Sequence, residues 1–136
     1  MKKYAITLLA LLISLHLVSC EEDDKPEVPQ TLNDCYVALN KELEKESESE
    51  LKNDIKKAAV KNLIRYHFSL GMWIRNNWRL WQTDNRLTQL FINIDIEDPD
   101  DMSTLIIMGY HYYLNGIEKT MEELVEEYIK TFQGTV

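Results

Sequence analysis

The stretch LGMWIRNNWRLW, residues 70–81, is dense in large side chains. Gly71 near its start is expected to weaken or bend a helical path. Large apolar side chains build the core of a small domain, so this stretch is predicted to lie at the centre of the fold. The side chains that fall at helical spacing are Leu70, Trp73, Ile74, Asn77, Trp78 and Trp81.

The segments before this stretch also follow helical periodicity. Thr31 is predicted to cap a helix that holds Asp34 in its first turn and runs as far as the charged residues 44–50. The apolar positions of this helix are Leu32, Cys35, Leu39 and Leu43. A second helix is predicted from a stripe that keeps one face, with lysines mostly opposite. The stripe consists of Leu51, Ile55, Ala59, Leu63 and Tyr66.

The segments after the stretch continue the pattern. A short apolar segment at residues 87–94 precedes a loop, after which Asp98 and Pro99 are predicted to begin a helix. Asn115 and Gly116 are expected to end it, and a capping box at residues 120–123 begins the last helix. The core face of the penultimate helix is expected at Met102, Ile106, Tyr110 and Tyr113 or Leu114. No sustained alternation indicates strands. Residues 31–136 are therefore predicted to form one all-α domain of about five helices.

Three motifs carry a family resemblance. They are residues 70–81, the segment DPDDMS at 98–103 and the segment YHYYLNG at 110–116. Together they resemble a short bacterial family classed as a domain of unknown function, number 6794, over most of residues 29–116. The chain departs from that pattern at Arg79, where a smaller residue is usual, and at Asp98, where another polar residue is common. The resemblance implies no activity.

Ten residues are candidates for a binding site or a structural network. They are Trp73, Arg75, Asn76, Asn77, Trp78, Trp81, Asp100, Asp101, Tyr110 and His111. The aromatic rings could form a platform for a sugar or a peptide. Their helical spacing favours core packing for most of them, and Tyr112 and Trp81 are the expected exceptions.

The polar members of this set favour a structural interpretation as well. Arg75 and Arg79 lie four residues apart and would share a helix face. They could grip a carboxylate or a phosphate, but an internal network with the acidic residues 95–101 is favoured. Asn76 and Asn77 are poor helix formers, so at least one is expected to hydrogen-bond a buried loop backbone.

The sequence contains little that indicates metal binding or catalysis. His67 and His111 have no second ligand at helical spacing, and residues 93–104 lack the glycine and the glutamate of a calcium loop. Cys35 lies on an apolar stripe and is expected to be a buried structural thiol. No metal, no cofactor and no enzymatic activity are therefore predicted.

The N-terminus indicates where the protein resides. Lys2 and Lys3 precede an apolar run that is too short to span a bilayer, and LVSC at residues 17–20 resembles a bacterial lipobox. Residues 1–19 are predicted to be a lipoprotein signal peptide, and Cys20 is predicted to become a lipidated N-terminus. Two or more acyl chains would then anchor the protein to the membrane. An ordinary secretory signal or an uncleaved anchor is the alternative.

Residues 20–30 form an acidic segment that is predicted to be a tether. Its EEDD cluster resembles the surface-export signal of Bacteroidota-type lipoproteins, although a simple solvated spacer is an equal alternative. Loss of Lys2 and Lys3 with the signal peptide would change the formal net charge from −8 to −10. Such a balance opposes binding to nucleic acid, and to anionic lipid without the acyl anchor.

These features predict a lipid-anchored protein of a Gram-negative outer membrane that faces either the periplasm or the cell surface. A non-catalytic interaction or accessory module with an unidentified protein partner is the first functional hypothesis, and it requires an exposed apolar or aromatic patch. A small ligand-binding lipoprotein for a glycan or peptide is the alternative, and it requires a pocket lined by tryptophan and tyrosine.

Overall fold

The computed structural model describes residues 27–45 and 48–134 as an assembly of helices, with no strand among these residues. The α-helices are α2 (Leu32–Leu43), α3 (Ser49–Lys57), α4 (Met72–Asn77), α5 (Arg86–Ile92), α6 (Pro99–Leu114) and α7 (Met121–Tyr128). The tighter 3-10 turn η1 (Val60–Tyr66) and the wider π-type turns η2 (His67–Gly71) and η3 (Ile129–Gln133) complete it. The all-α prediction is confirmed, whereas the predicted signal peptide, Cys20 and most of the predicted tether lie outside the described residues.

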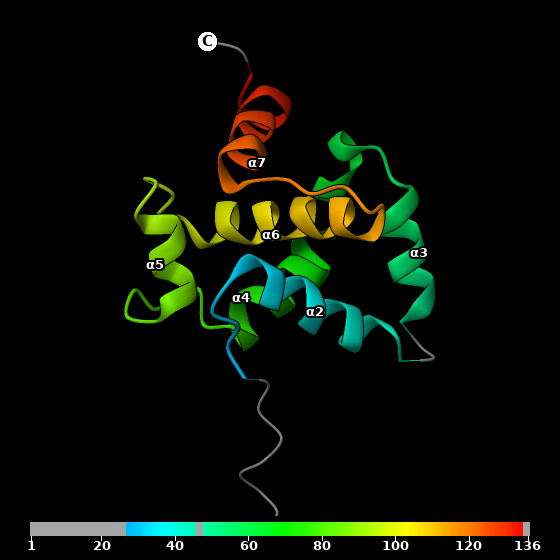
Figure 1. The fold of residues 1–136 in the computed structure, drawn as a ribbon, viewed down its shortest axis with the longest axis horizontal. Helices are drawn as coiled ribbons and strands as arrows, with labels where there is room; N and C mark the ends of the chain where they lie inside the picture. Colours follow the sequence, from blue (N-terminus) through cyan, green and yellow to red (C-terminus); the bar gives the residue numbers. More distant parts are fainter. Residues whose placement is uncertain (1–26, 46–47, 135–136) are drawn as a thin grey trace, which may run out of the picture.

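Helix α6 is the central element of the fold. It contacts α2, α3, α4, α7, η1 and η2, and Figure 1 shows it crossing the middle of the molecule between α7 and the α2–α4 side. Every residue from 102 to 110 is buried, so the single core face predicted for this helix is too narrow. A helix surrounded by others buries its whole circumference, and Ser103, Thr104 and Gly109 are therefore as enclosed as its apolar residues.

The predicted helix starts are confirmed at the level of single hydrogen bonds. Thr31 and Asp34 form a reciprocal capping box at the start of α2, and Thr120 and Glu123 form another at the start of α7. The Asp98 carboxylate accepts a hydrogen bond of 2.8 Å from the backbone N–H of Asp100 at the start of α6. These caps satisfy backbone donors that have no partner inside the helices.

The second predicted helix is wrong as a continuous element. It breaks after α3, because Ala58 and Ala59 have extended backbones with ψ of 146° and 143°. The carbonyls at the end of α3 are bonded from α6 instead: His111 Nδ1–H donates to the Ile55 carbonyl (2.8 Å), and the Asn115 amide donates to the Lys56 carbonyl (3.0 Å). Hydrogen bonds from His111 and Asn115 thus stabilise the C-terminal end of α3, although the local sequence of α3 does not indicate that the helix ends there.

The stretch 70–81 lies in the core only in part. Leu70, Ile74 and Trp78 are buried as predicted, but α4 ends at Asn77 and Arg79 has a left-handed φ of 51°. The chain therefore leaves the helical path before Trp81, which is 61% exposed. Gly71 has ordinary helical angles, so the predicted bend is not its role.

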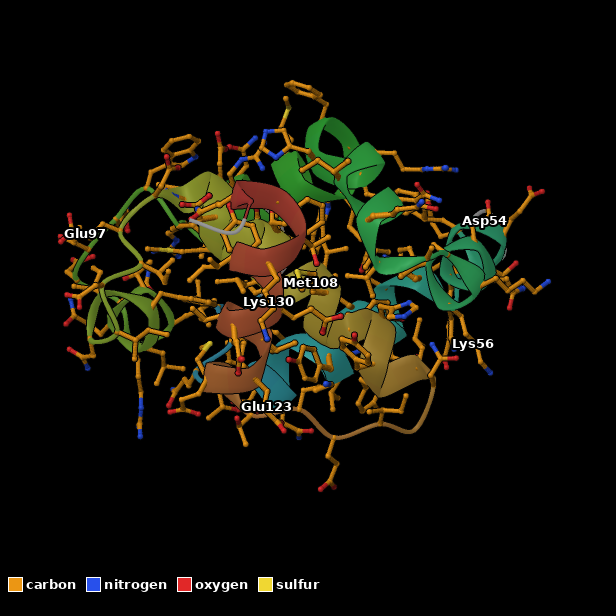
Figure 2. All side chains as sticks on the ribbon, turned by 90° about the horizontal axis from the view of Figure 1, so that it is seen from above. Asp54, Lys56, Glu97, Met108, Glu123 and Lys130 are labelled. Atoms are coloured by element: carbon orange, nitrogen blue, oxygen red, sulfur yellow. The ribbon has the colours of Figure 1, made fainter. Side chains whose placement is uncertain are left out.

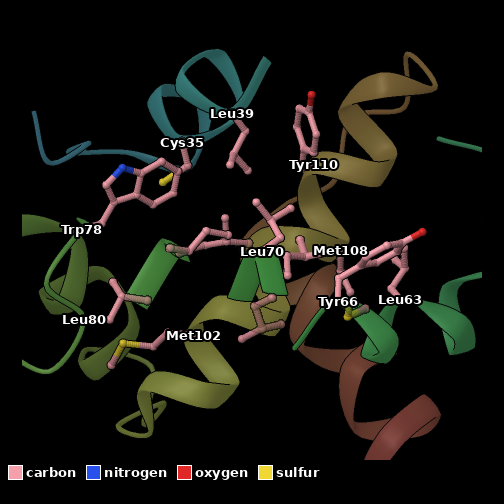
Figure 3. Close-up of a cluster of buried hydrophobic side chains, with 14 of the residues drawn as sticks. Cys35, Leu39, Leu63, Tyr66, Leu70, Trp78, Leu80, Met102, Met108 and Tyr110 are labelled. Atoms are coloured by element: carbon pink, nitrogen blue, oxygen red, sulfur yellow. The ribbon is translucent and has the colours of Figure 1, made fainter. Parts of the chain in front are cut away.

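The hydrophobic core gathers side chains from all parts of the described chain. Figure 3 shows Cys35 and Leu39 of α2 in one cluster with Trp78, and Met102, Met108 and Tyr110 of α6 complete the view. Cys35 is fully buried, and its burial raises the pKa of the thiol far above the ordinary value. It is a structural thiol, as predicted. None of the helices in residues 27–45 and 48–134 has the length and hydropathy needed to span a bilayer.

Candidate functional site

A buried arginine lies at the junction of η2, α4 and α6. Arg75 is 4% exposed, and its Nε lies 3.2 Å from Oδ1 of Asp100 in the first turn of α6. Its two terminal nitrogens donate to Ser103 Oγ (2.9 Å) and to the His67 carbonyl (3.1 Å). A Cβ on Gly71 would lie 2.9 Å from Arg75 Nη1, so the glycine leaves room for the guanidinium. The predicted pairing between Arg75 and the acidic helix start is confirmed.

The other expected members of the Arg–Asp network do not join it. Arg79 is exposed on the turn after α4, because the helix ends before it can share a face with Arg75. Asp101 instead accepts a hydrogen bond from the Tyr128 hydroxyl of α7. Burial and this bond raise the pKa of Tyr128 to about 12. Of the two acids at the start of α6, Asp100 therefore pairs with Arg75, and Asp101 bonds to Tyr128.

The two asparagines of α4 behave differently from the prediction. Asn77 donates to the carbonyl of Trp73 at 2.9 Å, which is a bond within its own helix and not to a loop. Asn76 is exposed. Neither side chain connects the helix to a loop backbone in the part of the chain that the structure describes.

The aromatic residues are divided between core and surface. Trp78 and Tyr110 are fully buried, and Trp73 is half-buried with its ring edge-on to Trp78 at 5.8 Å between centroids. Trp81 is exposed, as expected. Tyr112 is half-buried and donates to the Glu127 carboxylate at 2.6 Å, and burial together with that bond raises the pKa of Tyr112 to about 12.

A groove on another side of α6 holds none of the ten predicted site residues. It has a volume of about 620 Å³ and runs between α2, the end of α6 and the segment leading into α7. Its apolar lining is Leu32, Tyr36, Tyr113 and Ile117, and its polar rim is Asn33, Glu118, Lys119, Thr120 and Glu123. We call it the tyrosine groove.

Tyr36, Tyr113 and Gly109 pack closely together at the floor of the tyrosine groove. The rings of Tyr36 and Tyr113 lie 5.6 Å apart between centroids. The hydroxyl of Tyr36 is buried without a hydrogen-bond partner among the described residues, and it packs on Gly109, where a Cβ would lie 1.9 Å from it. Gly109 was the available sequence signal, since a glycine inside a long apolar helix often marks a close approach.

The arrangement offers no obvious reaction chemistry. No cluster of three or more histidine, cysteine or acidic side chains suited to a metal ion occurs among the described residues. His67 lies 3.8 Å from Asp100, while His111 is bonded to a backbone carbonyl, and neither lines the tyrosine groove. Hydrogen bonding and packing of a partner are what the groove can provide.

The comparisons with known proteins identify a family and no activity. No curated protein and no solved structure matches the chain. Residues 28–114 match the model of a family described as a domain of unknown function, DUF6794. This range contains α2 to α6 and includes Asn33 of the polar rim, but it ends before Glu118, Lys119, Thr120 and Glu123. The match extends over more than half of the sequence, and the chain therefore belongs to the DUF6794 family.

Proposed function

We propose that this protein is a non-catalytic interaction module of the bacterial cell envelope, anchored by lipid on Cys20, that receives a protein partner in the tyrosine groove. The groove carries the proposal. Tyr113 and Ile117 are 38% and 47% exposed there, between polar side chains such as Lys119 and Glu123. An apolar and aromatic strip bordered by polar groups is a common composition for a protein-binding surface.

The proposed role is non-catalytic because the side chains of Arg75, Cys35 and His111 are buried or already bonded within the protein. Arg75 is enclosed and bonded to Asp100 and Ser103, so it is not presented to a substrate. Cys35 is fully buried, and burial raises the pKa of its thiol, which disfavours the nucleophilic thiolate. His111 is committed to the Ile55 carbonyl. None of these three groups is presented to a substrate.

The envelope location in this proposal rests on the sequence before residue 27. Lys2, Lys3, the apolar run and LVSC at residues 17–20 have the order of a lipoprotein signal. Acyl chains on Cys20 would hold the domain at the outer membrane, and the EEDD cluster at 21–24 is compatible with either a surface-export signal or a solvated spacer. This is a proposal about the mature chain, whose first described residue is Glu27.

A small ligand-binding lipoprotein is the second candidate function, and the floor of the groove favours it. Two tyrosine rings at 5.6 Å, inclined by 37°, offer faces on which a sugar ring or a peptide side chain could pack. The groove volume of about 620 Å³ lies in the range of small-molecule sites. The pocket differs from the predicted one, since it contains tyrosines without tryptophan or Arg75.

Photo-crosslinking in the native envelope tests the proposal. A benzophenone amino acid replaces Ile117 in the groove, and the matched control replaces Val37, an apolar residue of α2 that is 52% exposed. We expect a discrete protein adduct from position 117, lost when Tyr113→Asp is added, and no such adduct from position 37. A carbohydrate adduct at 117 would favour the second candidate. Identical products from both positions, or none from either, would refute a binding role for the groove.

A further inference from the structure

An apolar stripe remains uncovered on the segment that runs through η1, η2 and the start of α4. Ile64, Phe68 and Met72 are 48%, 79% and 46% exposed, and they lie four residues apart. Leu63 and Leu70 of the same segment are buried. One side of the segment therefore packs on the core, and the other presents large apolar side chains to the surroundings.

The same segment is the basic part of an acidic protein. Residues 55–83 contain six of the 15 lysines and arginines and none of the 23 acids. Lys61 and Arg65 are exposed on η1, where Lys61 precedes Ile64 by three residues and Arg65 directly follows it. Arg75 is the buried member of the six, and it is the partner of Asp100. The exposed charges that the segment itself carries are therefore positive, and Asp100 of α6, which lies 3.8 Å from His67, is an acid from a neighbouring element close to Phe68.

We propose that Lys61, Ile64, Arg65, Phe68 and Met72, which we call the basic apolar face, rest on the anionic phospholipid surface of a bilayer. Apolar side chains enter the boundary between headgroups and acyl chains, and flanking cations contact lipid phosphates. Lysine and arginine suit this position because their long stems lie along apolar surface while their charges reach the headgroups.

The charge pattern favours a bilayer over a second copy of the chain as the occupant of the basic apolar face. A second copy of the chain, docked symmetrically on this face, would bring Lys61 and Arg65 against the same cations with no acid from residues 55–83 to compensate them. The acidic remainder of the chain is repelled by anionic lipid, so this face is the one that can turn toward it.

Chain length is compatible with such a contact. If Cys20 carries the anchor, the seven peptide steps to Glu27 span at most about 25 Å, so the domain stays near the lipid surface. This step alone rests on the proposed anchor. Figure 2 shows the green ribbon of η1 and η2 at one edge of the molecule and Glu123, on the rim of the tyrosine groove, at the opposite edge. A domain seated on the basic apolar face would therefore hold the groove away from the membrane.

Vesicle binding by the chain from residue 20 onward, with Cys20→Ala, tests the face without the anchor. This chain keeps every residue of the core cluster, which begins at Cys35, and also Val28, which packs against it. The net charge of the chain opposes this contact, so binding has to come from the basic apolar face. We expect co-sedimentation with vesicles containing phosphatidylglycerol and none with pure phosphatidylcholine. Removing two surface cations, in Lys61→Gln with Arg65→Gln, should weaken the partition about 30-fold. The matched control, Lys41→Gln with Lys130→Gln, changes the net charge equally on α2 and η3 and should retain binding.

A serine variant tests the apolar component. Phe68→Ser should abolish binding, and unchanged thermal unfolding would show that the loss is not a folding defect, since the side chain is 79% exposed. Equal binding by the two double variants, Lys61→Gln with Arg65→Gln and Lys41→Gln with Lys130→Gln, or binding to vesicles of pure phosphatidylcholine, would overturn the proposal. So would a stable dimer in the absence of vesicles that Phe68→Ser dissociates. None of these results depends on the tyrosine groove or on lipidation of Cys20.

Discussion

The guanidinium of Arg75 is almost completely enclosed, yet its charged partner Asp100, at 3.2 Å, has a side chain that is 48% exposed. The pair thus extends from the interior of the helical domain to its surface, at the point where α6 begins. A buried cation whose counter-ion remains solvated depends strongly on that counter-ion, whereas the counter-ion depends little on the cation.

This asymmetry predicts that Asp100→Asn destabilises the protein more than Arg75→Met. Asparagine leaves the enclosed guanidinium without a negative partner, at a cost of about 3 kcal/mol. Methionine fills much of the space and removes the charge, at a cost of about 1–2 kcal/mol for the bond to the His67 carbonyl. Urea unfolding followed by tryptophan fluorescence measures both. Asp95→Asn is the control, because Asp95 is exposed and asparagine tolerates its φ of 65°. Equal losses for the two variants would contradict the asymmetry.

Alkaline pH should loosen the attachment of α7. Burial and the bond to Glu127 raise the pKa of Tyr112 to about 12, and burial and the bond to Asp101 do the same for Tyr128. The folded state thus holds these protons more tightly than the unfolded chain, whose tyrosines titrate near about 10. Their contribution is complete below pH 10 and is lost as the pH rises through about 12. The urea concentration at the unfolding midpoint should therefore decrease when the pH is raised from neutral to about 11.

The double variant Tyr112→Phe, Tyr128→Phe tests that assignment. It should be less stable than the parent at neutral pH, because two hydrogen bonds to carboxylates are lost. It should also lose less stability on alkalinisation, because two linked protons are gone. Tyr113→Phe, at an exposed ring, is the control. An unchanged alkaline slope in the double variant would show that other groups cause it.

The contact between Tyr36 and Gly109 predicts that substitutions at these two positions change the stability of the protein in opposite directions. Tyr36→Phe removes a buried hydroxyl that has no partner among the described residues, so it should stabilise the protein by about 1 kcal/mol. Gly109→Ala places a methyl group against the same ring and should destabilise it by about 1–3 kcal/mol. Tyr112→Phe is the matched control and should be destabilising, since that hydroxyl is bonded. Chemical denaturation measures all three, and a destabilised Tyr36→Phe variant would indicate a partner for the hydroxyl.

Cys20→Ala should release the protein from membranes or leave its precursor uncleaved. Without the thiol no diacylglyceryl group can be attached, and a single weak contact does not give stable anchoring. Membrane fractionation and the mass of the product measure the effect, with Ser19→Ala as a conservative control beside it. Unchanged mass and unchanged detergent partitioning of the alanine variant would refute lipidation.

Local signals in the sequence predict the starts of three helices well. Thr31, Asp98 and Thr120 begin helices as predicted, because a capping side chain acts on backbone groups only two or three residues away. The break after α3 could not be predicted in this way. It depends on His111 and Asn115, which lie 56 and 59 residues from the carbonyls that they bond.

Candidate site residues were harder to predict. Charge and helical spacing predict that Arg75 pairs with the acidic residues 95–101, but they do not distinguish Asp100 from the other acids. The tyrosine groove was missed because its lining comes from two separate segments, and Tyr36 and Ile117 resemble ordinary core positions in the sequence. Trp81 was expected at the surface, but the left-handed Arg79 that turns the chain there has no sequence signal of the usual glycine type.

The tyrosine groove is formed partly by residues that match the family and partly by residues that follow the matched range. Its floor, with Tyr36, Gly109 and Tyr113, belongs to residues 28–114, whereas Ile117, Lys119 and Glu123 follow them. Helix α7, which contains Glu123, is held to α6 by the hydrogen bonds of Tyr112 and Tyr128, and its Leu124 is buried in the core cluster. Substitutions confined to the exposed residues Ile117 and Glu118 would therefore change the chemistry of the groove while the packing of Tyr36 on Gly109 at the floor stays intact.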